Sequence, residues 1–164
     1  MDQVGRDQRI LLDCDMPSRL AHLENLFPSL SESGYSKSSE KDPSYNCIAF
    51  AVHDTGQFWQ KLSVHGYYWP LERDDRLEDW IRALSLNNYK TTDNWDLEPG
   101  VEKVAIYVGG DGSPEHVARQ LESGAWTSKI GRLEDIRHAT LGGLEGKEYG
   151  RATVIMRRKR FTPK

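Results

Sequence analysis

The chain has 164 residues, of which 37% are hydrophobic and 29% charged, and its formal net charge is −3. This length suits one domain with a sizeable core, and five Trp, seven Tyr and four Phe argue against disorder. The small negative charge excludes a general attraction to nucleic acid or anionic membranes. We therefore expect one folded domain over residues 1–164, with no nucleic-acid and no membrane partner.

We expect no signal peptide, because residues 1–9 are polar and the apolar patch behind them covers only residues 10–12. A membrane span needs about 18 apolar residues. We expect a cytoplasmic protein, and export by a specialised secretion system stays open. Cys14 and Cys47 could pair, but two cysteines make no disulfide framework, so free thiols are expected. The Cys and His spacings match no metal site, and we expect neither metal nor cofactor.

The first predicted element is a short helix that Ser18 could cap and Pro28 would end. Its apolar residues share one face of a helix: Leu20, Leu23 and Phe27. Residues 31–43 are rich in Ser, Lys and Glu, and this composition predicts a connecting loop. We treat residues 1–43 as a lead-in to the core of the domain.

A helix is predicted at residues 46–53, and it is apolar nearly all round, so it should be buried. Cys47 lies on its first turn, after a short polar lead-in. The positive end of a helix dipole lowers the pKa of a thiol and raises its thiolate fraction. Cysteine hydrolases keep their nucleophile in such a position, so Cys47 is the first candidate for chemistry.

Residues 57–70 form an aromatic-rich segment bounded by Gly and Pro. Two interpretations stay open: a loop that covers the core, or a platform that contacts a substrate. Residues 75–86 predict a packing helix with Asp75 as its cap. Its apolar residues recur at helical spacing: Leu77, Trp80, Ile81 and Leu84.

After residue 100 the apolar period changes to that of strands, which we predict at residues 101–108, 115–121, 125–130 and 152–156. Helices followed by an antiparallel sheet give an α+β domain. The basic run at residues 157–160 is expected to be a solvated terminus, and a nucleic-acid tail is the alternative.

A cysteine nucleophile needs a base, and His116 is the best candidate because it opens a predicted strand beside the turn at residues 111–114. The other histidines have weaker positions. They lie on the cysteine helix facing away from the thiol (His53), on the N-terminal helix without polar neighbours (His22), in the aromatic segment (His65) and in an irregular segment (His138).

The hairpin after His116 indicates which residue could orient its ring. Residues 122–124 read Glu-Ser-Gly, a three-residue loop whose last position suits a left-handed glycine. The register of such a loop puts His116 and Ser128 on one face, close enough for a hydrogen bond. A two-residue loop would make Thr127 the partner instead, and His138 also stays open.

Three short blocks carry a resemblance to a known family: Tyr-Asn-Cys-Ile-Ala-Phe-Ala at 45–51, His-Val-Ala-Arg-Gln-Leu at 116–121 and Trp-Thr-Ser-Lys-Ile-Gly at 126–131. Their order resembles that of the papain-like cysteine hydrolases, and within them the bacterial NlpC-type amidopeptidases. The chain looks like a bacterial branch, without an assigned activity, that carries an Asn-Cys helix start and a Trp-Thr-Ser-Lys hairpin. The resemblance covers roughly residues 44–156 and implies a papain-like fold, with the cysteine helix packed on a small antiparallel sheet.

By position, the resemblance implies that Cys47 is the nucleophile, His116 the base and Ser128 the third polar residue. In the family that third residue is more often His, Asn or Asp, and serine would give a weaker ion pair. An alternative alignment matches the family's histidine strand to residues 101–108, where Lys103 replaces the histidine and His116 takes the third position.

The implied reaction is acyl transfer, in which the Cys47 thiolate attacks an amide or thioester carbonyl. The backbone N–H of Cys47, helped by Asn46 or Tyr45, would hold the oxyanion, although Asn46 could equally be a helix cap. We expect Trp69 and Trp126 to contact the substrate.

We therefore predict a cysteine hydrolase, an amidase or peptidase, whose partner is a peptide or other amide substrate. The alternatives are a deamidase or transglutaminase-type acyl transferase, and an inactive papain-like binding module. In a third alternative, an immunity or scaffold protein, the cysteine would be only a buried small residue.

Overall fold

The computed structural model describes residues 20–42, 45–53, 76–131 and 133–160, together with the backbone of 58–59 and 67–68. Five of the residues singled out above lie outside this part of the chain: Cys14, Ser18, His65, Trp69 and Asp75. Most of the aromatic segment 57–70 lies outside it as well, so its two interpretations stay open.

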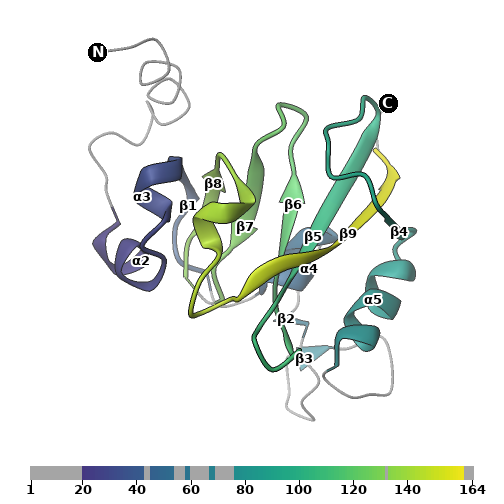
Figure 1. Cartoon of the computed structure of the whole chain (residues 1–164), viewed down its shortest axis with the longest axis horizontal. Helices are drawn as coiled ribbons and strands as arrows, with labels where there is room; N and C mark the ends of the chain where they lie inside the picture. Colours follow the sequence, from purple (N-terminus) through teal and green to yellow (C-terminus); the bar gives the residue numbers. More distant parts are fainter. Residues whose placement is uncertain are drawn as a thin grey trace.

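The main element is a seven-stranded antiparallel sheet, with strand order β1-β8-β7-β6-β5-β9-β4 (Figure 1). The strands are β1 (Tyr35–Ser39), β4 (Lys90–Thr92), β5 (Val101–Val108), β6 (Pro114–Gln120), β7 (Trp126–Lys129), β8 (Asp135–His138) and β9 (Arg151–Lys159). Two further strands, β2 (Phe58–Trp59) and β3 (Tyr67–Tyr68), pair in parallel with each other. With its helices, the domain is α+β, as the sequence predicts.

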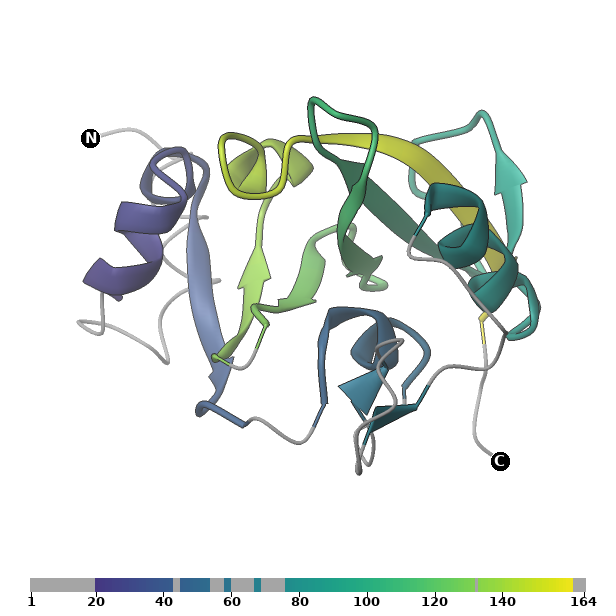
Figure 2. The same cartoon turned by 90° about the horizontal axis from the view of Figure 1, so that it is seen from below.

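The helices in the described part of the chain are short. They are α2 (Ala21–Leu26), α3 (Leu30–Ser33), α4 (Cys47–Ala51), α5 (Leu77–Ser85) and the 3-10 helix η2 (Leu141–Leu144). Figures 1 and 2 show α2 and α3 at the β1 end and α5 near the β4 end, with α4 between them. Among the described helices, none has the length and apolar character needed to cross a membrane.

The sheet separates two core clusters, because successive side chains of a strand point to opposite faces. In β5, Val104 and Ile106 join residues of α4 and α5 in the first cluster. Ala105 and Tyr107 join residues of α2, α3 and η2 in the second. The two faces therefore give α4 a different environment from the N-terminal helices.

Most predicted elements are confirmed. The helices expected at residues 46–53 and 75–86 are α4 and α5, and the strands expected at 101–108, 115–121, 125–130 and 152–156 are β5, β6, β7 and β9. The N-terminal helix is also present as α2, with Leu23 and Phe27 buried. The last strand continues past Met156 to Lys159, since β9 pairs along the whole of β5.

The loop predicted at residues 31–43 is wrong, because α3 ends and β1 lies within it. Only Ser36 of β1 is buried, so this edge strand has no apolar alternation to reveal it. It forms because its backbone pairs with β8, a strand in a segment that the sequence predicts to be irregular. Both strands depend on each other, and neither has a strong local signal.

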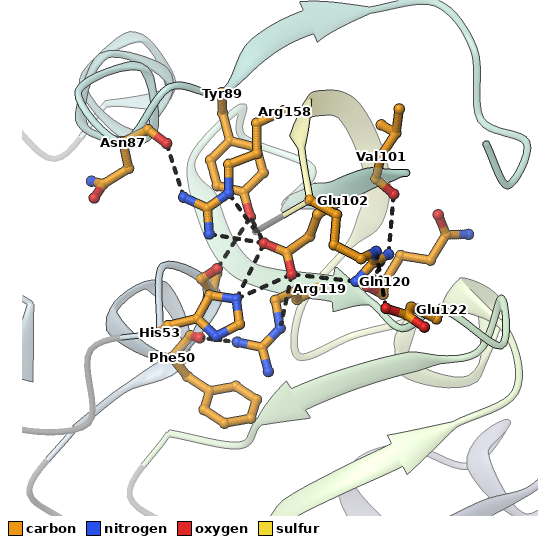
Figure 3. Close-up of polar contacts among 12 residues, drawn as sticks. Phe50, His53, Asn87, Tyr89, Val101, Glu102, Arg119, Gln120, Glu122 and Arg158 are labelled. Atoms are coloured by element: carbon orange, nitrogen blue, oxygen red, sulfur yellow. Dashed lines mark hydrogen bonds and ion pairs between the residues drawn. The ribbon is translucent and has the colours of Figure 1, made fainter. Parts of the chain in front are cut away.

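A buried carboxylate, Glu102, joins several distant segments through ion pairs and hydrogen bonds (Figure 3). Its partners are His53 Nε2 (3.1 Å), Tyr89 Oη (2.8 Å), Arg158 Nη2 (2.8 Å), Arg160 Nη1 (3.5 Å) and Arg119 Nε (4.0 Å). We call these residues the Glu102 cluster. Burial would raise the pKa of the Glu102 carboxyl, but the hydrogen bonds from His53, Tyr89 and Arg158 outweigh it, lowering this pKa to about 2.

The sequence predicts that the basic run at residues 157–160 is a solvated terminus. In the structure, two of its arginines are instead largely buried. Arg158 and Arg160 turn inward to Glu102, and their side chains are only 15% and 14% exposed. Arg158 also stacks on the Tyr89 ring, 4.3 Å from its centroid, and donates to the carbonyl of Asn87. The run closes the Glu102 cluster because β9 brings it beside β5.

We predict that Glu102→Gln lowers the free energy of unfolding at pH 7 by about 3 kcal/mol, because buried guanidiniums lose their counter-charge. The folded-state pKa near 2 lies below the ordinary value of 4.5. The stabilisation is thus present above pH 4.5 and is lost as pH falls towards 2. Urea unfolding at several pH values should show the difference between variant and wild type shrinking as the solution is acidified.

The matched control is Glu122→Gln. Glu122 lies 3.9 Å from Arg160, but its side chain is 81% exposed, so its ion pair is screened by water. We expect this change to cost less than about 0.5 kcal/mol. Equal losses in the two variants would show that Glu102 has no special role in stability.

Candidate functional site

The start of α4 is fixed by Asn46, whose extended backbone and side chain cap the helix. Its Oδ1 accepts a hydrogen bond from the backbone N–H of Ala49, at 3.3 Å. The cap makes Cys47 the first residue of the helix, as the sequence predicts. Capping is thus the observed use of the Asn46 side-chain oxygen.

The other end of α4 is held by the Glu102 cluster. Arg119 Nη1 donates to the carbonyl of Phe50 at 2.6 Å, and Tyr89 Oη, whose hydrogen goes to Glu102 at 2.8 Å, lies 3.4 Å from the carbonyl oxygen of Ala51. His53, just beyond the helix, lies against Glu102. A cation at a helix C-terminus is favourable, and together these bonds fix the helix that carries Cys47.

Cys47 is buried, with 8% of its surface exposed, and it packs in the first core cluster. Burial raises the pKa of its thiol to about 11, although the backbone N–H groups of Val117, Ile48 and Cys47 itself favour the thiolate. The lowered pKa that the helix start predicts is therefore wrong for this conformation. The thiol is neutral at pH 7.

The predicted register of the hairpin between β6 and β7 is confirmed. The N–H of Leu121 donates to the carbonyl of Ala125 at 2.8 Å, and Gly124 has a φ of 95°. Arg119 lies opposite Thr127. The loop therefore has three residues, and its glycine takes the left-handed conformation that this turn requires.

This register brings Ser128 to His116. The distance between Ser128 Oγ and His116 Nε2 is 2.9 Å, and both side chains are fully buried. The hydroxyl of Thr127 points elsewhere and donates to the carbonyl of Ile136 at 3.2 Å. Of the two candidates on β7, Ser128 is therefore the one that contacts the histidine.

The hydrogen bonds continue from Ser128 to a second histidine. Ser128 Oγ lies 2.8 Å from His138 Nε2, and His138 Nδ1 lies 2.9 Å from the carbonyl oxygen of Thr140. We call the chain His116–Ser128–His138–Thr140 the histidine relay. His138 enters it because β8 pairs with β7, placing it opposite Trp126. The four-residue strand Asp-Ile-Arg-His is too short for its sequence to predict this.

The ring of His116 is enclosed by aromatic side chains. It stacks on Tyr149 with centroids 4.2 Å apart and an angle of 3°, and Tyr107 lies 5.3 Å away. Its Nδ1 is buried and has no hydrogen-bond partner among the described residues. Burial, helped by His138, keeps the pKa of His116 well below its ordinary value, and burial lowers that of His138 to about 4.

The Cys47 thiol and the His116 side chain lie at adjacent residues of β6, in different surroundings. The N–H of Val117, the residue after His116, favours the Cys47 thiolate, whereas His116 faces Tyr107 and Tyr149. Burial and then the charge of a Cys47 thiolate raise the pKa of Tyr149 well above its ordinary value. The thiol therefore lies near the Tyr149 side chain that stacks on His116, but the two candidates are not hydrogen-bonded to each other.

The hydrogen-bonded ladder between β6 and β7 is short. Strands β6 and β7 pair only at Arg119–Thr127 and Gln120–Trp126. Beyond these pairs the ladder ends, and α4 packs against both strands. The helix that carries Cys47 therefore contacts two strands whose common ladder is short.

Two of the residues predicted to bind substrate have packing contacts in the structure. Tyr45 donates its hydroxyl to Asp135 Oδ2 at 2.7 Å, and burial together with this carboxylate raises its pKa to about 12. Trp126 is 5% exposed and packs in the second core cluster. Their roles towards a substrate stay predictions.

The alternative alignment depends on Lys103, which is fully buried in β5. Its Nζ donates to the carbonyls of Asn94 and Asp96, at 2.6 and 2.5 Å, and lies 2.8 Å from Glu98 Oε2. The lysine thus fastens the segment between β4 and β5. It has this structural use whichever alignment is correct.

The remaining histidines have acidic neighbours. His22 Nε2 lies 3.0 Å from Glu134 Oε1, so the prediction that it lacks polar company is wrong. His53 belongs to the Glu102 cluster. In the part of the chain that the structure describes, no group of three or more His, Cys, Asp or Glu is placed to hold a metal ion.

A family model, described as a domain of unknown function (DUF7689), matches residues 36–157. The match includes α4, the β6–β7 hairpin and the histidine relay. Neither the curated proteins nor the solved structures contain a match to this chain.

We predict that Tyr149→Ala increases the rate at which iodoacetamide alkylates Cys47 by about tenfold or more at pH 7.5. Removing the ring admits water near the thiol, and its pKa should fall from about 11 towards the ordinary 9.0. The alkylated peptide, identified by mass spectrometry, distinguishes Cys47 from Cys14. Tyr149→Phe keeps the ring and should react like the wild type. An unchanged rate in Tyr149→Ala would show that this ring does not cover the thiol.

Proposed function

This chain belongs to the family of the domain of unknown function DUF7689, and from the residues around α4 and β6 we propose that it is a cysteine hydrolase. In this proposal Cys47 is the nucleophile and His116 the general base, while Ser128 orients the imidazole. The substrate is a peptide or another amide. The arrangement of cysteine helix, histidine strand and polar residue on the next strand supports a papain-like fold for the domain.

One observation carries the proposal. Nε2 of His116 is hydrogen-bonded to Ser128 Oγ, whereas Nδ1 is buried without a hydrogen-bond partner among the described residues. An unpaired buried nitrogen is costly, so it calls for an explanation. A general base provides one, since its accepting nitrogen has to stay available, and in this proposal the proton that it accepts comes from the Cys47 thiol.

The reaction begins from a neutral pair, because burial raises the pKa of Cys47 and lowers that of His116. As the sulfur attacks the carbonyl carbon, the thiol proton passes to His116 Nδ1. The C–N bond then breaks, the leaving amine takes that proton, and a thioester remains on Cys47. Water attacks the thioester, giving a proton to Nδ1, and the carboxylic acid leaves as the thiol is restored.

Backbone N–H groups can stabilise the negative oxygen of the tetrahedral intermediates. Those of Val117, Ile48 and Cys47 lie near the sulfur and favour negative charge there. The side chains of Asn46 and Tyr45 are engaged elsewhere in this conformation, with Ala49 and Asp135. We therefore assign the oxyanion to backbone donors rather than to these two side chains.

A second candidate, an inactive papain-like binding module, is favoured by the burial of the cysteine. A thiol whose pKa is about 11 is a poor nucleophile at pH 7, because little thiolate forms. In this case the Glu102 cluster and the histidine relay would only stabilise the fold. The two candidates differ in whether His116 changes the reactivity of Cys47.

The experiment uses p-nitrophenyl acetate as an acyl donor. We predict that the wild type releases p-nitrophenol while one acetyl group is transferred to Cys47, located by peptide mass spectrometry. Cys47→Ala should lose this acetylation, and His116→Ala should slow it by about a hundredfold, since a general base contributes roughly 10²–10⁴.

Cys14→Ser is the matched control, because it removes the other thiol of the chain and should leave acetylation of Cys47 unchanged. Circular dichroism and thermal unfolding would verify that each variant is folded. The hydrolase proposal fails if folded His116→Ala is acetylated at Cys47 as fast as the wild type. That outcome would favour the binding module.

A further inference from the structure

We infer that the histidine relay fixes the tautomer of His116, so that its Nε2 carries the proton and its Nδ1 presents a lone pair. Ser128 and His138 are then positioning residues for the base. The catalytic meaning of this inference depends on the proposed hydrolase function, but the tautomer itself does not.

The positions of the protons in the relay follow from the backbone carbonyl of Thr140. Its carbonyl oxygen can only accept a hydrogen bond, so His138 Nδ1, 2.9 Å away, must donate. His138 is fully buried and neutral at pH 7, since burial lowers its pKa to about 4. A neutral imidazole has one N–H, and here that N–H is at Nδ1. Nε2 of His138 is therefore an acceptor.

Ser128 transmits this order to the next ring. Its hydroxyl has one hydrogen, which it donates to His138 Nε2 at 2.8 Å. The same oxygen then has only lone pairs for His116 Nε2, at 2.9 Å. His116 Nε2 must donate, and because the ring is neutral its Nδ1 is unprotonated.

The result explains the unpaired Nδ1 of His116. In the described part of the chain this buried nitrogen has no donor opposite it, and the relay leaves it as a bare acceptor. Val117, the next residue, directs its N–H towards the Cys47 sulfur. The opposite tautomer would place a proton on Nδ1, which could then not accept the proton of a thiol.

The relay also gives serine a use at a position where a charged or amide side chain is the commoner choice. A hydroxyl accepts from one ring while donating to the other, so it links two neutral histidines without adding charge. The buried site contains no carboxylate in this chain of bonds. A carbonyl of the backbone, Thr140, sets the direction instead.

The test is long-range ¹H–¹⁵N NMR of histidine-labelled protein at pH 7. We expect the Nε2–H tautomer for His116 and the Nδ1–H tautomer for His138. In Ser128→Ala, His116 should become a mixture of tautomers. Thr127→Val is the matched control, because it removes another buried hydroxyl, from the adjacent residue outside the relay, and should leave both tautomers unchanged.

A wild-type His116 protonated at Nδ1 would overturn the inference, and this measurement needs no variant to fold. A His116 tautomer that is the same in folded Ser128→Ala as in the wild type would also overturn it. If the tautomers are as expected but p-nitrophenyl acetate never acetylates Cys47, the relay stands and the hydrolase proposal fails. If both hold, Ser128→Ala should slow acetylation at least about tenfold, as a misplaced histidine proton does in other triads.

Discussion

The structure depends on one buried charge, the carboxylate of Glu102. An unpaired buried charge is strongly unfavourable, so such a group must be surrounded by partners. Glu102 draws its partners from the end of α4, from the segment after α5 and from strands β6 and β9. These segments cannot move apart without exposing or unpairing the charge. Through His53 and Arg119 the same cluster also fixes the helix that carries Cys47.

Local sequence patterns predict the elements whose apolar residues recur with a clear period. Strand β5 and the β6–β7 hairpin belong to this group, and the glycine of the turn was enough to set the register of Ser128 against His116. Strands β1 and β8 are different, because their stability comes from pairing with each other across about a hundred residues of chain. The sequence therefore does not predict the strand that gives His138 its partner.

The reactivity of Cys47 could not be predicted from its place on a helix, and the energies explain why. A helix terminus contributes about 0.3–1 kcal/mol to a charged group, and α4 has only five residues. Burial raises the pKa of the thiol from 9.0 to about 11, which corresponds to roughly 3 kcal/mol. The larger effect depends on how α4 packs against β6 and β7, which sequence periodicity does not report.

Strand β6 contributes to both the Glu102 cluster and the histidine relay, because the side chains of alternate residues point to different faces of the sheet. His116 enters the histidine relay, while Arg119 holds the Phe50 carbonyl of α4 and faces Glu102. Between them, the N–H of Val117 lies near the sulfur of Cys47. Helix α4 is thus held at its C-terminal end, far from the Cys47 thiol. The imidazole of His116 is held at Nε2, the nitrogen across the ring from the unpaired Nδ1. In the hydrolase proposed above, the sulfur of Cys47 and Nδ1 of His116 are the atoms that react.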